Sequence, residues 1–410
     1  MSTIPEIDLN LFDYELPKSK IAEFPLENRE DSKLLFFDSN SNILEHSNFK
    51  TISNLVENNS LLVMNNTKVI AARIPALKSS GGKAEILCIE PISPSIDPQI
   101  VMNSKDTCTW KCIIGGRNIK KDDVLITSDK KLEAFILEKK DNIALVEFSW
   151  KEFTFAQMLN NIGKIPLPPY IKREATEFDY IRYQTVYAKN EGSVAAPTAG
   201  LHFSDNIIDD LKRKNVKITE LILHVGPGTF LPIESDDIRT HNMHFEQFFV
   251  HKNSLENIYN AIISGNDIIA TGTTSIRTLE SIYILGAKLL ENDIDFNNLN
   301  VLQEDAYNLY KNSSMPTAEN VIYSILNLMD KHNIEQIYGK TQLFIVPGFK
   351  FQIVNKLITN FHLPKSTLLL LVAAFIGTDN FKKVYQSALE NNYRFLSYGD
   401  SSLLVRTDIS

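Results

Sequence analysis

Between about residues 70 and 150 the sequence changes to a run of short β-rich segments, and this run limits the folds open to the chain. The segments are separated by Gly-Gly pairs and by turns rich in Lys and Asp. They are Ala84–Ile89, Thr109–Ile114, Val124–Ile126, Leu132–Leu137 and Ile143–Phe148. Several short strands at regular spacing, with no helix between them, indicate a small β-barrel.

The segments on both sides of this run mix helix and strand patterns. Before it, residues 34–37 and 61–64 are apolar runs typical of buried strands. After it, the predicted elements are a helix that begins after Ser204, a strand at Val216–Val225, a helix at Leu255–Ile263, a strand at Asp267–Ala270, helices at Ile276–Leu285 and Ala318–Leu328, and a strand at Leu343–Val346. This alternation predicts an α/β sheet with helices packed on it. We therefore expect a main α/β domain, residues 1–69 plus 151–410, with an inserted β-barrel domain, residues 70–150.

The composition is that of a globular protein of enzyme size. Of the 410 residues, 43% are hydrophobic and 22% charged, which excludes a disordered or fibrous chain. Three cysteines without a Cys-x-x-Cys pair argue against a disulfide scaffold and fit a reducing cytoplasm. The N-terminus has no signal-peptide pattern, and the longest apolar run, Leu368–Ile376, is too short to cross a membrane. We expect a cytoplasmic protein that has no membrane partner.

Two strand ends carry residue types that suit ligand binding. The predicted strand at 216–225 delivers His224 and then Gly226, Gly228 and Thr229, and paired glycines let backbone approach a ligand closely. A tight turn beside a buried histidine is the alternative. The strand at 267–270 leads into a helix through Gly272, Thr273, Thr274 and Ser275, followed by Arg277. Backbone N–H groups at such a helix start bind anions, although simple capping by Thr and Ser is the other interpretation.

Five of the eight histidines lie in segments rich in Gly, Pro, Thr or Asn. They are His202, His224, His241, His244 and His362. The spacing of His241, His244 and Glu246 leaves three interpretations open, namely a metal site, a catalytic or substrate-binding site, and a structural role. Neutral histidine near pH 7 suits acid–base catalysis, and Glu246 would raise the pKa of a neighbouring histidine.

Two further segments place polar residues before a helix. The segment 192–204 crowds small residues, including Thr198 and Gly200, before a helix start, which suits a loop pressed against a planar or sugar-like ligand or against the sheet. Asn360 and His362 precede the apolar helix at 368–376, again at a helix N-terminus that favours anions.

A set of longer motifs runs through essentially the whole chain. They are Phe12–Pro17, Ile165–Ile171, Arg182–Ala188, Ser193–Phe203, Leu223–Phe230, the stretch with His241, His244 and Glu246, Thr271–Glu280, Pro347-Gly348, Leu357–Thr367 and Tyr393–Asp400. In this order they resemble the S-adenosylmethionine:tRNA ribosyltransferase-isomerases of queuosine biosynthesis. The departures are Asn66 where the family usually has Asp, Ser401-Ser402 in place of small apolar residues, and a longer stretch at 290–340.

The resemblance implies a reaction. S-adenosylmethionine donates its ribosyl unit to 7-aminomethyl-7-deazaguanine at the wobble position of a tRNA with a GUN anticodon. The ribose isomerises to give epoxyqueuosine, and adenine and methionine leave. S-adenosylmethionine is then a co-substrate, and no permanently bound cofactor or metal is expected. The resemblance also implies a monomer.

This chemistry needs several proton transfers in one pocket. We expect His202, His224, His241, His244 and Glu246 to supply them. Substrate-binding residues are expected in the loops described above and in the last motif; they are Thr198, Gly200, Gly226, Gly228, Thr229, Gly272, Thr273, Thr274, Ser275, Arg277, Asn360, His362 and Tyr398. Thr271–Ser275 with Arg277 would hold the methionine carboxylate or an RNA phosphate.

Because the net charge is −8, RNA must meet local basic groups. The candidates are Lys212-Arg213-Lys214, which also reads as a solvated helix face, and Lys111, Arg117, Lys120 and Lys121 of the predicted barrel. Three other protein classes remain as alternatives. The chain lacks the Gly-rich first turn that is typical of S-adenosylmethionine methyltransferases. A zinc hydrolase would use His241, His244 and Glu246 as its metal site, and a non-catalytic RNA-binding protein would not explain why His and Gly/Thr loops gather at the strand ends.

Overall fold

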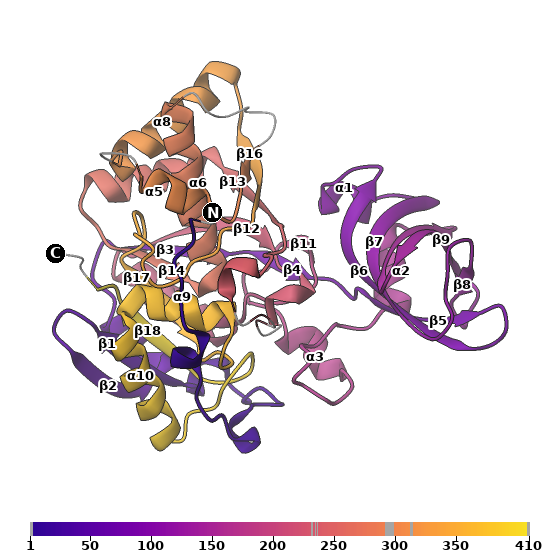
Figure 1. Ribbon diagram of the computed structural model, residues 1–410, viewed down its shortest axis with the longest axis horizontal. Coiled ribbons are helices and arrows are strands. Elements are labelled where there is room, and N and C mark those ends of the chain that lie inside the picture. Colours follow the sequence, from indigo (N-terminus) through magenta and orange to yellow (C-terminus); the bar gives the residue numbers. More distant parts are fainter. Residues whose placement is uncertain are drawn as a thin grey trace.

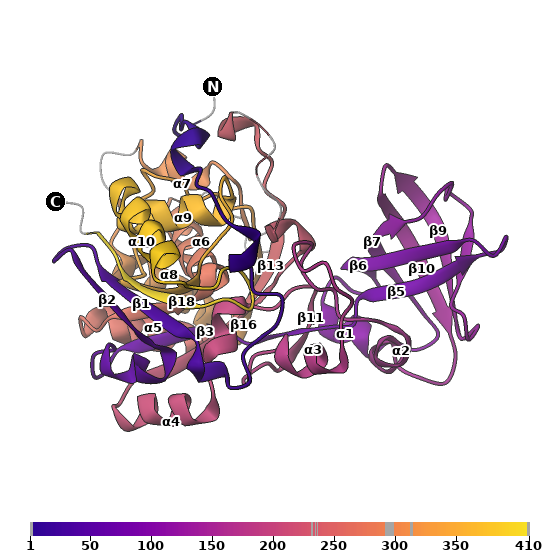
Figure 2. The same cartoon turned by 90° about the horizontal axis from the view of Figure 1, so that it is seen from below.

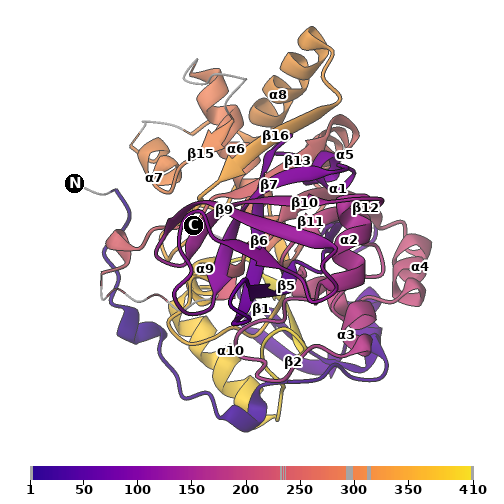
Figure 3. The ribbon, with the colours of Figure 1, turned by 90° about the vertical axis from the view of Figure 1, so that its right-hand side faces the viewer.

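The chain forms a large α/β body with a smaller β-barrel beside it (Figure 1). This computed structural model describes residues 3–230, 233, 235, 237–291, 299–311 and 315–407. The chain enters the barrel after β4 (Thr67–Val69) and leaves it through α2 (Phe155–Ile162). Viewed from the barrel side, the barrel lies in front of the body (Figure 3). The predicted class, an α/β sheet with an inserted barrel, is confirmed.

The body is built on one ten-stranded mixed sheet. Its spatial order is β15 (Asn300–Val301), β16 (Gln336–Thr341), β13 (Glu246–His251), β12 (Lys217–His224), β3 (Leu61–Asn65), β14 (Ile268–Thr271), β17 (Lys356–Asn360), β18 (Ser401–Val405), β1 (Lys33–Asp38) and β2 (Ile43–Asn48). The four central strands β12, β3, β14 and β17 run parallel. Their carboxyl ends therefore meet at one edge, the place where ligands bind in open α/β sheets.

Helices cover both faces of this sheet. They are α4 (Asp205–Arg213), α5 (Lys252–Ile263), α6 (Gly272–Leu290), α7 (Asp305–Leu309), α8 (Ala318–His332), α9 (Thr367–Ile376) and α10 (Thr378–Glu390), with α3 (Glu177–Arg182) near the barrel. In Figure 2, α4 lies on the opposite side of the sheet from α6, α9 and α10. A second, two-stranded sheet pairs β4 with β11 (Asn190–Ser193).

Strand β3 shows how the sequence produces two cores. All five of its residues are buried, as is typical of a central parallel strand. Successive side chains point to opposite faces. Leu61 and Val63 therefore join the large core with α6 and α9, whereas Leu62 and Met64 join the core under α4.

The barrel is closed by six antiparallel strands. They are β10 (Ile143–Trp150), β7 (Thr107–Gly115), β6 (Lys83–Ser93), β5 (Arg73–Lys78), β8 (Val124–Ile126) and β9 (Leu132–Lys140). Helix α2 packs Phe155 against Trp110, Phe148 and Trp150, with ring centroids 5.1–5.7 Å apart. The barrel therefore has its own core, separate from those of the sheet.

Three expectations about single elements are corrected. Strand β5 was not expected; it carries Pro75 on its exposed side, between the buried Ile74 and Ala76. The barrel segment contains a short helix, α1 (Pro98–Met102), between β6 and β7, where no helix was expected.

The predicted strand at 343–346 is buried but is not a strand. Its backbone bonds to side chains instead of to a neighbouring strand. Tyr307 Oη donates to the carbonyl of Phe344 at 2.8 Å and accepts from the N–H of Val346 at 3.2 Å. The stretch 290–340 is described except for residues 292–298 and 312–314, so its Asn-rich start lies largely outside the described residues. None of the described helices combines the length and apolarity needed to cross a bilayer.

Candidate active site

Two adjoining cavities lie at the carboxyl ends of the central parallel strands. The first, of about 40 Å³, is lined by predicted residues Thr198, Thr229, Gly272, Thr273, Thr274, Asn360 and His362. The second, of about 330 Å³, is lined by predicted residues Gly226, Gly228, Thr229, His241, His244, Glu246 and Arg277. Thr229 and Leu368 line both. The fold therefore brings most of the predicted residues to one continuous region.

The start of α6 forms one wall of the first cavity. Gly272 has φ +88°, a conformation that favours glycine, and this lets the chain turn from β14 into the helix. Thr274 Oγ1 is buried and has no hydrogen-bond partner among the described residues. Ser275 is different, because its Oγ donates to the carbonyl of Thr271 at 2.7 Å inside the helix. Ser275 does not line either cavity.

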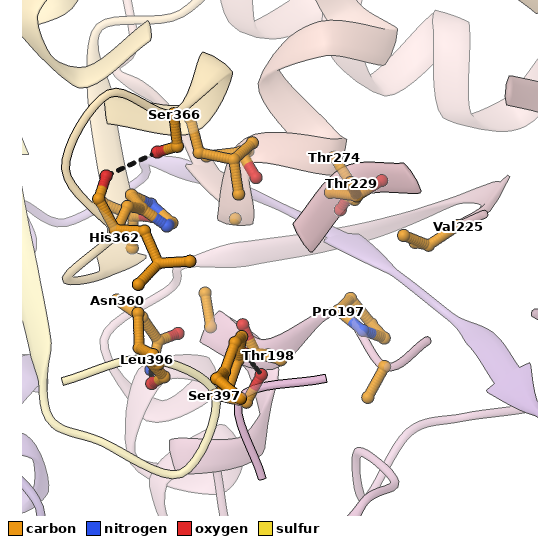
Figure 4. A pocket seen from close by; sticks show the side chains of 18 residues that line it. Pro197, Thr198, Val225, Thr229, Thr274, Asn360, His362, Ser366, Leu396 and Ser397 are labelled. Atoms are coloured by element: carbon orange, nitrogen blue, oxygen red, sulfur yellow. Dashed lines mark hydrogen bonds between the residues drawn. The ribbon is translucent and has the colours of Figure 1, made fainter. Parts of the chain in front are cut away.

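Asn360, at the end of β17, forms part of the facing wall (Figure 4). Its Nδ2 donates to the carbonyl of Leu396 at 3.1 Å and lies 3.2 Å from His202 Nε2. These two contacts fix the amide orientation, so Oδ1 is the free side of the group. Oδ1 is buried and has no partner among the described residues. The cavity thus holds an unused acceptor opposite the unused hydroxyl of Thr274.

His362 also lines the first cavity. It is buried, and its Nε2 lies 2.9 Å from Thr359 Oγ1. Burial lowers the pKa of His362 to about 3, because the charged imidazolium loses its hydration. His362 is therefore neutral at pH 7.

The second cavity contains a buried ion pair. Arg277 Nη1 binds Glu246 Oε2, and Thr229 Oγ1 donates to Glu246 Oε1 at 2.9 Å. Arg277 Nε donates to the carbonyl of Leu343 at 3.2 Å, while Nη2 is buried with no partner in the described part of the chain. Glu246 thus neutralises the arginine, and one N–H group remains for a ligand.

His241 and His244 lie on the more open side of the second cavity. His241 is half-buried, with its ring 5.7 Å from that of Phe344, and His244 is exposed. Glu246 pairs with Arg277. Within the described residues no three His, Cys, Asp or Glu side chains gather as a metal site would require.

His202 and His224 lie behind the cavity walls. Both are buried. Burial is the main reason why the pKa of His202 falls to about 3 and that of His224 to about 4. His202 Nδ1 lies 2.8 Å from Ser32 Oγ, and since Asn360 donates to Nε2, the proton sits on Nδ1. His224 Nδ1 lies 2.8 Å from Thr67 Oγ1. Each ring holds a neighbouring polar residue in place.

Gly200 and Tyr398 lie outside the two cavities. A Cβ on Gly200 would lie 2.0 Å from Tyr187 Oη, so this glycine permits close packing. Tyr398 Oη donates to Asp179 Oδ1 at 2.7 Å, and Tyr398 lines a third, smaller cavity together with His202.

Sequence reasoning missed other residues of the first cavity, including Tyr170, Thr359 and Ser397. Ser397 lies in the motif Tyr393–Asp400, which offered a signal, whereas Thr359 directly precedes the predicted Asn360. Tyr170 lies in the motif Ile165–Ile171, which also offered a signal, and the fold brings it to the site, where it contacts Ser397.

Comparisons with known proteins identify the family of the chain. A family model described as queuosine biosynthesis protein matches residues 9–404. The S-adenosylmethionine:tRNA ribosyltransferase-isomerase of Thermotoga petrophila is 39% identical over 396 residues, covering 96% of this chain and 98% of the relative. That of Legionella pneumophila strain Paris is 38% identical over 395 residues, with the same coverage. The crystal structure of the S-adenosylmethionine tRNA ribosyltransferase of Thermotoga maritima aligns with a TM-score of 0.47 at 29% identity, covering 96% of this chain and 100% of that one. The resemblance carried by the motifs is confirmed, and the chain belongs to the queuosine biosynthesis protein family.

Proposed function

We propose that the protein is an S-adenosylmethionine:tRNA ribosyltransferase-isomerase. It transfers the ribosyl unit of S-adenosylmethionine to 7-aminomethyl-7-deazaguanine at the wobble position of a tRNA with a GUN anticodon. The products are epoxyqueuosine in the RNA, adenine and methionine. Relatives with 38–39% identity over nearly the whole chain carry this enzyme name, which supports the proposal.

One observation carries the assignment to the two cavities. Three buried polar atoms without a partner among the described residues belong to their walls, namely Thr274 Oγ1, Asn360 Oδ1 and Arg277 Nη2. A buried polar group left unpaired costs about 1–3 kcal/mol, so such atoms mark the place of a ligand. S-adenosylmethionine has the matching groups: ribose hydroxyls, an adenine amine and a carboxylate.

The charge and hydrogen-bonding groups of the cavity walls suit, at different places, the two ends of S-adenosylmethionine, its methionine carboxylate and its adenosyl group. Arg277 Nη2 binds the methionine carboxylate in the second cavity, since a charge-assisted hydrogen bond is stronger there than a neutral one. Asn360 Oδ1 accepts from a hydroxyl or amine of the adenosyl part, and Thr274 donates to one of its oxygen or nitrogen atoms. The α6 N-terminus at Gly272 and Thr273 adds backbone N–H groups.

The reaction breaks the bond from ribose to adenine and the bond from C5′ to sulfur, and it joins the ribosyl unit to the amine nitrogen, which loses one proton. To give the epoxycyclopentane, the five ribose carbons close into a ring through a new C1′–C5′ bond, the ring oxygen separates from one of its two carbons, and C5′ forms the epoxide C–O bond in place of its bond to sulfur. Of the two protons released, from C5′ and from the amine, one goes to adenine and the other to solvent. The positive sulfonium acidifies the C5′ protons, so a positioned base removes one. Adenine leaves with a proton, and the amine attacks in its neutral form.

We assign the proton transfers to His241, His244 and His362, which line the cavities. Glu246 holds Arg277, His202 orients Asn360, and His224 orients Thr67. These three are positioning residues in the proposal. We further propose that the enzyme acts in the cytoplasm as a monomer without a permanently bound cofactor.

A product assay tests the proposal. The protein is incubated with S-adenosylmethionine and an anticodon stem-loop that carries the aminomethyl-deazaguanine, and the digested RNA is analysed by nucleoside mass spectrometry. We expect epoxyqueuosine, with adenine and methionine released in equal amounts. A methylated nucleoside, or intact RNA with folded protein, would contradict the proposal.

A further inference from the structure

The third cavity is lined by three arginines, of which Arg182 and Arg394 lie in the motifs Arg182–Ala188 and Tyr393–Asp400. Arg29, Arg182 and Arg394 come from distant parts of the chain and line a space of about 20 Å³. Ser397 lines both this cavity and the first one, so the two sites lie on either side of a single residue. The arginine cavity is therefore next to the proposed active site.

Two of these guanidinium groups lack a paired carboxylate within the described residues; Asp205 acts on Arg29 only at longer range, where its charge raises the pKa of Arg29. In the described part of the chain neither Arg29 nor Arg182 forms an ion pair. Arg29 donates to the carbonyls of Leu201 at 3.2 Å and Ile181 at 3.0 Å, and Arg182 Nη1 donates to the carbonyl of Glu27 at 2.7 Å. Neutral carbonyls satisfy the hydrogen bonds but leave both charges in place.

The remaining donors point to a missing ligand. Arg182 is 8% exposed, and its Nε is buried with no partner among the described residues. Arg394 does pair with Asp400, at 3.3 Å. Burial, and next the positive charge of Arg182, lower the pKa of Arg29 to about 10, and burial lowers the pKa of Arg182. The positive charge of Arg182 lowers the pKa of Arg29, and the charges of Arg394 and Arg29 add to burial in lowering the pKa of His202 in the same cavity, so the cavity has a positive potential that favours an anion.

The size and the rim of the cavity restrict that anion. A volume of about 20 Å³ holds one or two water-sized groups, so it takes the oxygens of a phosphoryl group and excludes a base or a sugar. Three residues that contact its arginines have exposed apolar side chains: Phe24, Phe178 and Ile181 are 56%, 48% and 68% exposed. The Arg182 guanidinium lies 5.3 Å from the ring centroid of Phe178, and that of Arg173 lies 4.1 Å from the ring of Phe24.

Arginine beside exposed aromatic rings is the pattern by which proteins bind unpaired RNA, with phosphates on the guanidinium groups and bases stacked on the rings. We propose that the cavity of Arg29, Arg182 and Arg394 binds one phosphodiester of the RNA substrate, next to the nucleotide that enters the first cavity. The inference rests on the proposed function for the identity of the RNA. Helix α3, which carries Phe178 and Arg182, lies between the sheet and the barrel in Figures 1 and 2.

The basic run expected from the sequence is less suited to this role. Lys212 lies 3.4 Å from Asp209, and Arg213 pairs with Asp210 of the same helix. Lys214 donates to the carbonyl of Val56 at 3.1 Å. Acidic residues of α4 therefore neutralise much of that charge locally.

The test compares Arg29→Met with Arg213→Met, which removes the same charge from α4. Binding of the anticodon stem-loop is followed by fluorescence anisotropy at several salt concentrations. We expect R29M to weaken binding about tenfold and to reduce the slope of log K against log[salt] by about one, as for the loss of one phosphate contact. R213M should change neither value. Equal effects of the two variants, or none for R29M, would overturn the inference.

Arg29→Lys guards against a trivial loss of folding, because Arg29 also holds two backbone carbonyls. R29K keeps the charge, so it should restore the salt slope and part of the affinity. A titration with inorganic phosphate tests whether the cavity is a site for free phosphate and not for a phosphodiester of RNA. Tight phosphate binding that R29M abolishes, with RNA binding unchanged, would contradict the RNA assignment. The binding experiment does not depend on turnover. Wild-type protein that binds RNA through Arg29 but forms no product would therefore contradict the proposed function and leave the inference about the arginine cavity intact.

Discussion

Arg277 and Glu246 form a buried ion pair in the wall of the second cavity, with side chains 6% and 4% exposed. The sequence suggested Arg277 as an anion ligand and Glu246 as a partner of a histidine. Because the two residues bind each other, Glu246 serves to hold Arg277, and Arg277 has only part of its guanidinium group available for an anion. Glu246 balances the guanidinium and turns it, so that Nη2 remains available.

Removing the carboxylate should destabilise the protein strongly. Glu246→Gln leaves Arg277 charged and buried, and breaking a buried pair on one side costs about 3–5 kcal/mol. Thr229→Val removes only the hydroxyl that donates to Glu246, and it should cost about 1 kcal/mol. Urea unfolding measures both. A loss for E246Q no larger than that for T229V would show that the pair does not hold the site.

Thr274→Val separates binding from stability. Its hydroxyl has no partner in the described structure, so removal of the hydroxyl should leave the free energy of unfolding unchanged or raise it. The Kd for S-adenosylmethionine should rise about five- to tenfold, the value of one neutral hydrogen bond.

Thr278→Val is the matched control on the same helix. Thr278 Oγ1 donates to the carbonyl of Thr274 at 2.9 Å, so T278V should lose about 1 kcal/mol of stability and keep the wild-type Kd. Calorimetric titration and urea unfolding give both quantities. The opposite assignment, with T278V weakening binding and T274V not, would place the ligand elsewhere.

Two glycines of one turn, Gly226 and Gly228, test the position of His244. A Cβ on Gly228 would lie 2.5 Å from His244 Cδ2, whereas a Cβ on Gly226 meets no atom within 4 Å. Gly228→Ala should displace the imidazole and lower kcat/KM at least about tenfold, since small misplacements are costly in catalysis. Gly226→Ala adds the same methyl group to the same cavity, and its loss should be several times smaller. Equal losses would mean that the His244 position is not important.

The buried histidines predict a pH dependence of stability. His202 has a pKa of about 3 in the folded protein and about 6.5 when unfolded, so the unfolded chain binds more protons between these values. The contribution of the neutral, buried His202 to the free energy of unfolding is therefore complete above about pH 6.5 and is lost as the pH falls toward 3.

Between pH 7 and pH 5 this one histidine should account for about 2 kcal/mol of lost stability. Glutamine does not titrate in this range, so His202→Gln should remove this contribution to the loss of stability between pH 7 and pH 5. His251→Gln, which changes an exposed histidine, should retain it. Urea unfolding at the two pH values decides. An equal decrease in H202Q and wild type would contradict the buried neutral state.

The parts of the fold that local pattern determines were predictable. β3 is a continuous apolar run, and the barrel strands β6 to β10 have apolar runs between turns. The segment 343–346 has the same local pattern and still is not a strand, because the groups that satisfy its backbone belong to Tyr307 and Arg277. Such partners come from the tertiary fold and leave no mark on the segment itself.

For the candidate site, the sequence indicated residues at strand ends but not which side chains are buried behind the cavity walls. Gly and Thr at strand ends pointed to Gly272, Thr274 and Thr229, and these residues line the two cavities because the carboxyl ends of parallel strands meet at one edge. The sequence did not show that His202 and His224 lie behind the walls, since burial depends on what packs over them. Arg29 and Arg182 stand alone in separate segments, and only the fold brings them to one cavity.

The central claim is that S-adenosylmethionine acts as a ribosyl donor in the two cavities. The most direct measurement uses co-substrate labelled with ¹³C either in the ribose or in the methyl group, together with the aminomethyl-deazaguanine stem-loop. Mass spectrometry then follows the label. The account predicts that the ribose label appears in the modified nucleoside and the methyl label remains in released methionine. Methyl label in the RNA, or ribose label that stays with adenine, would contradict it.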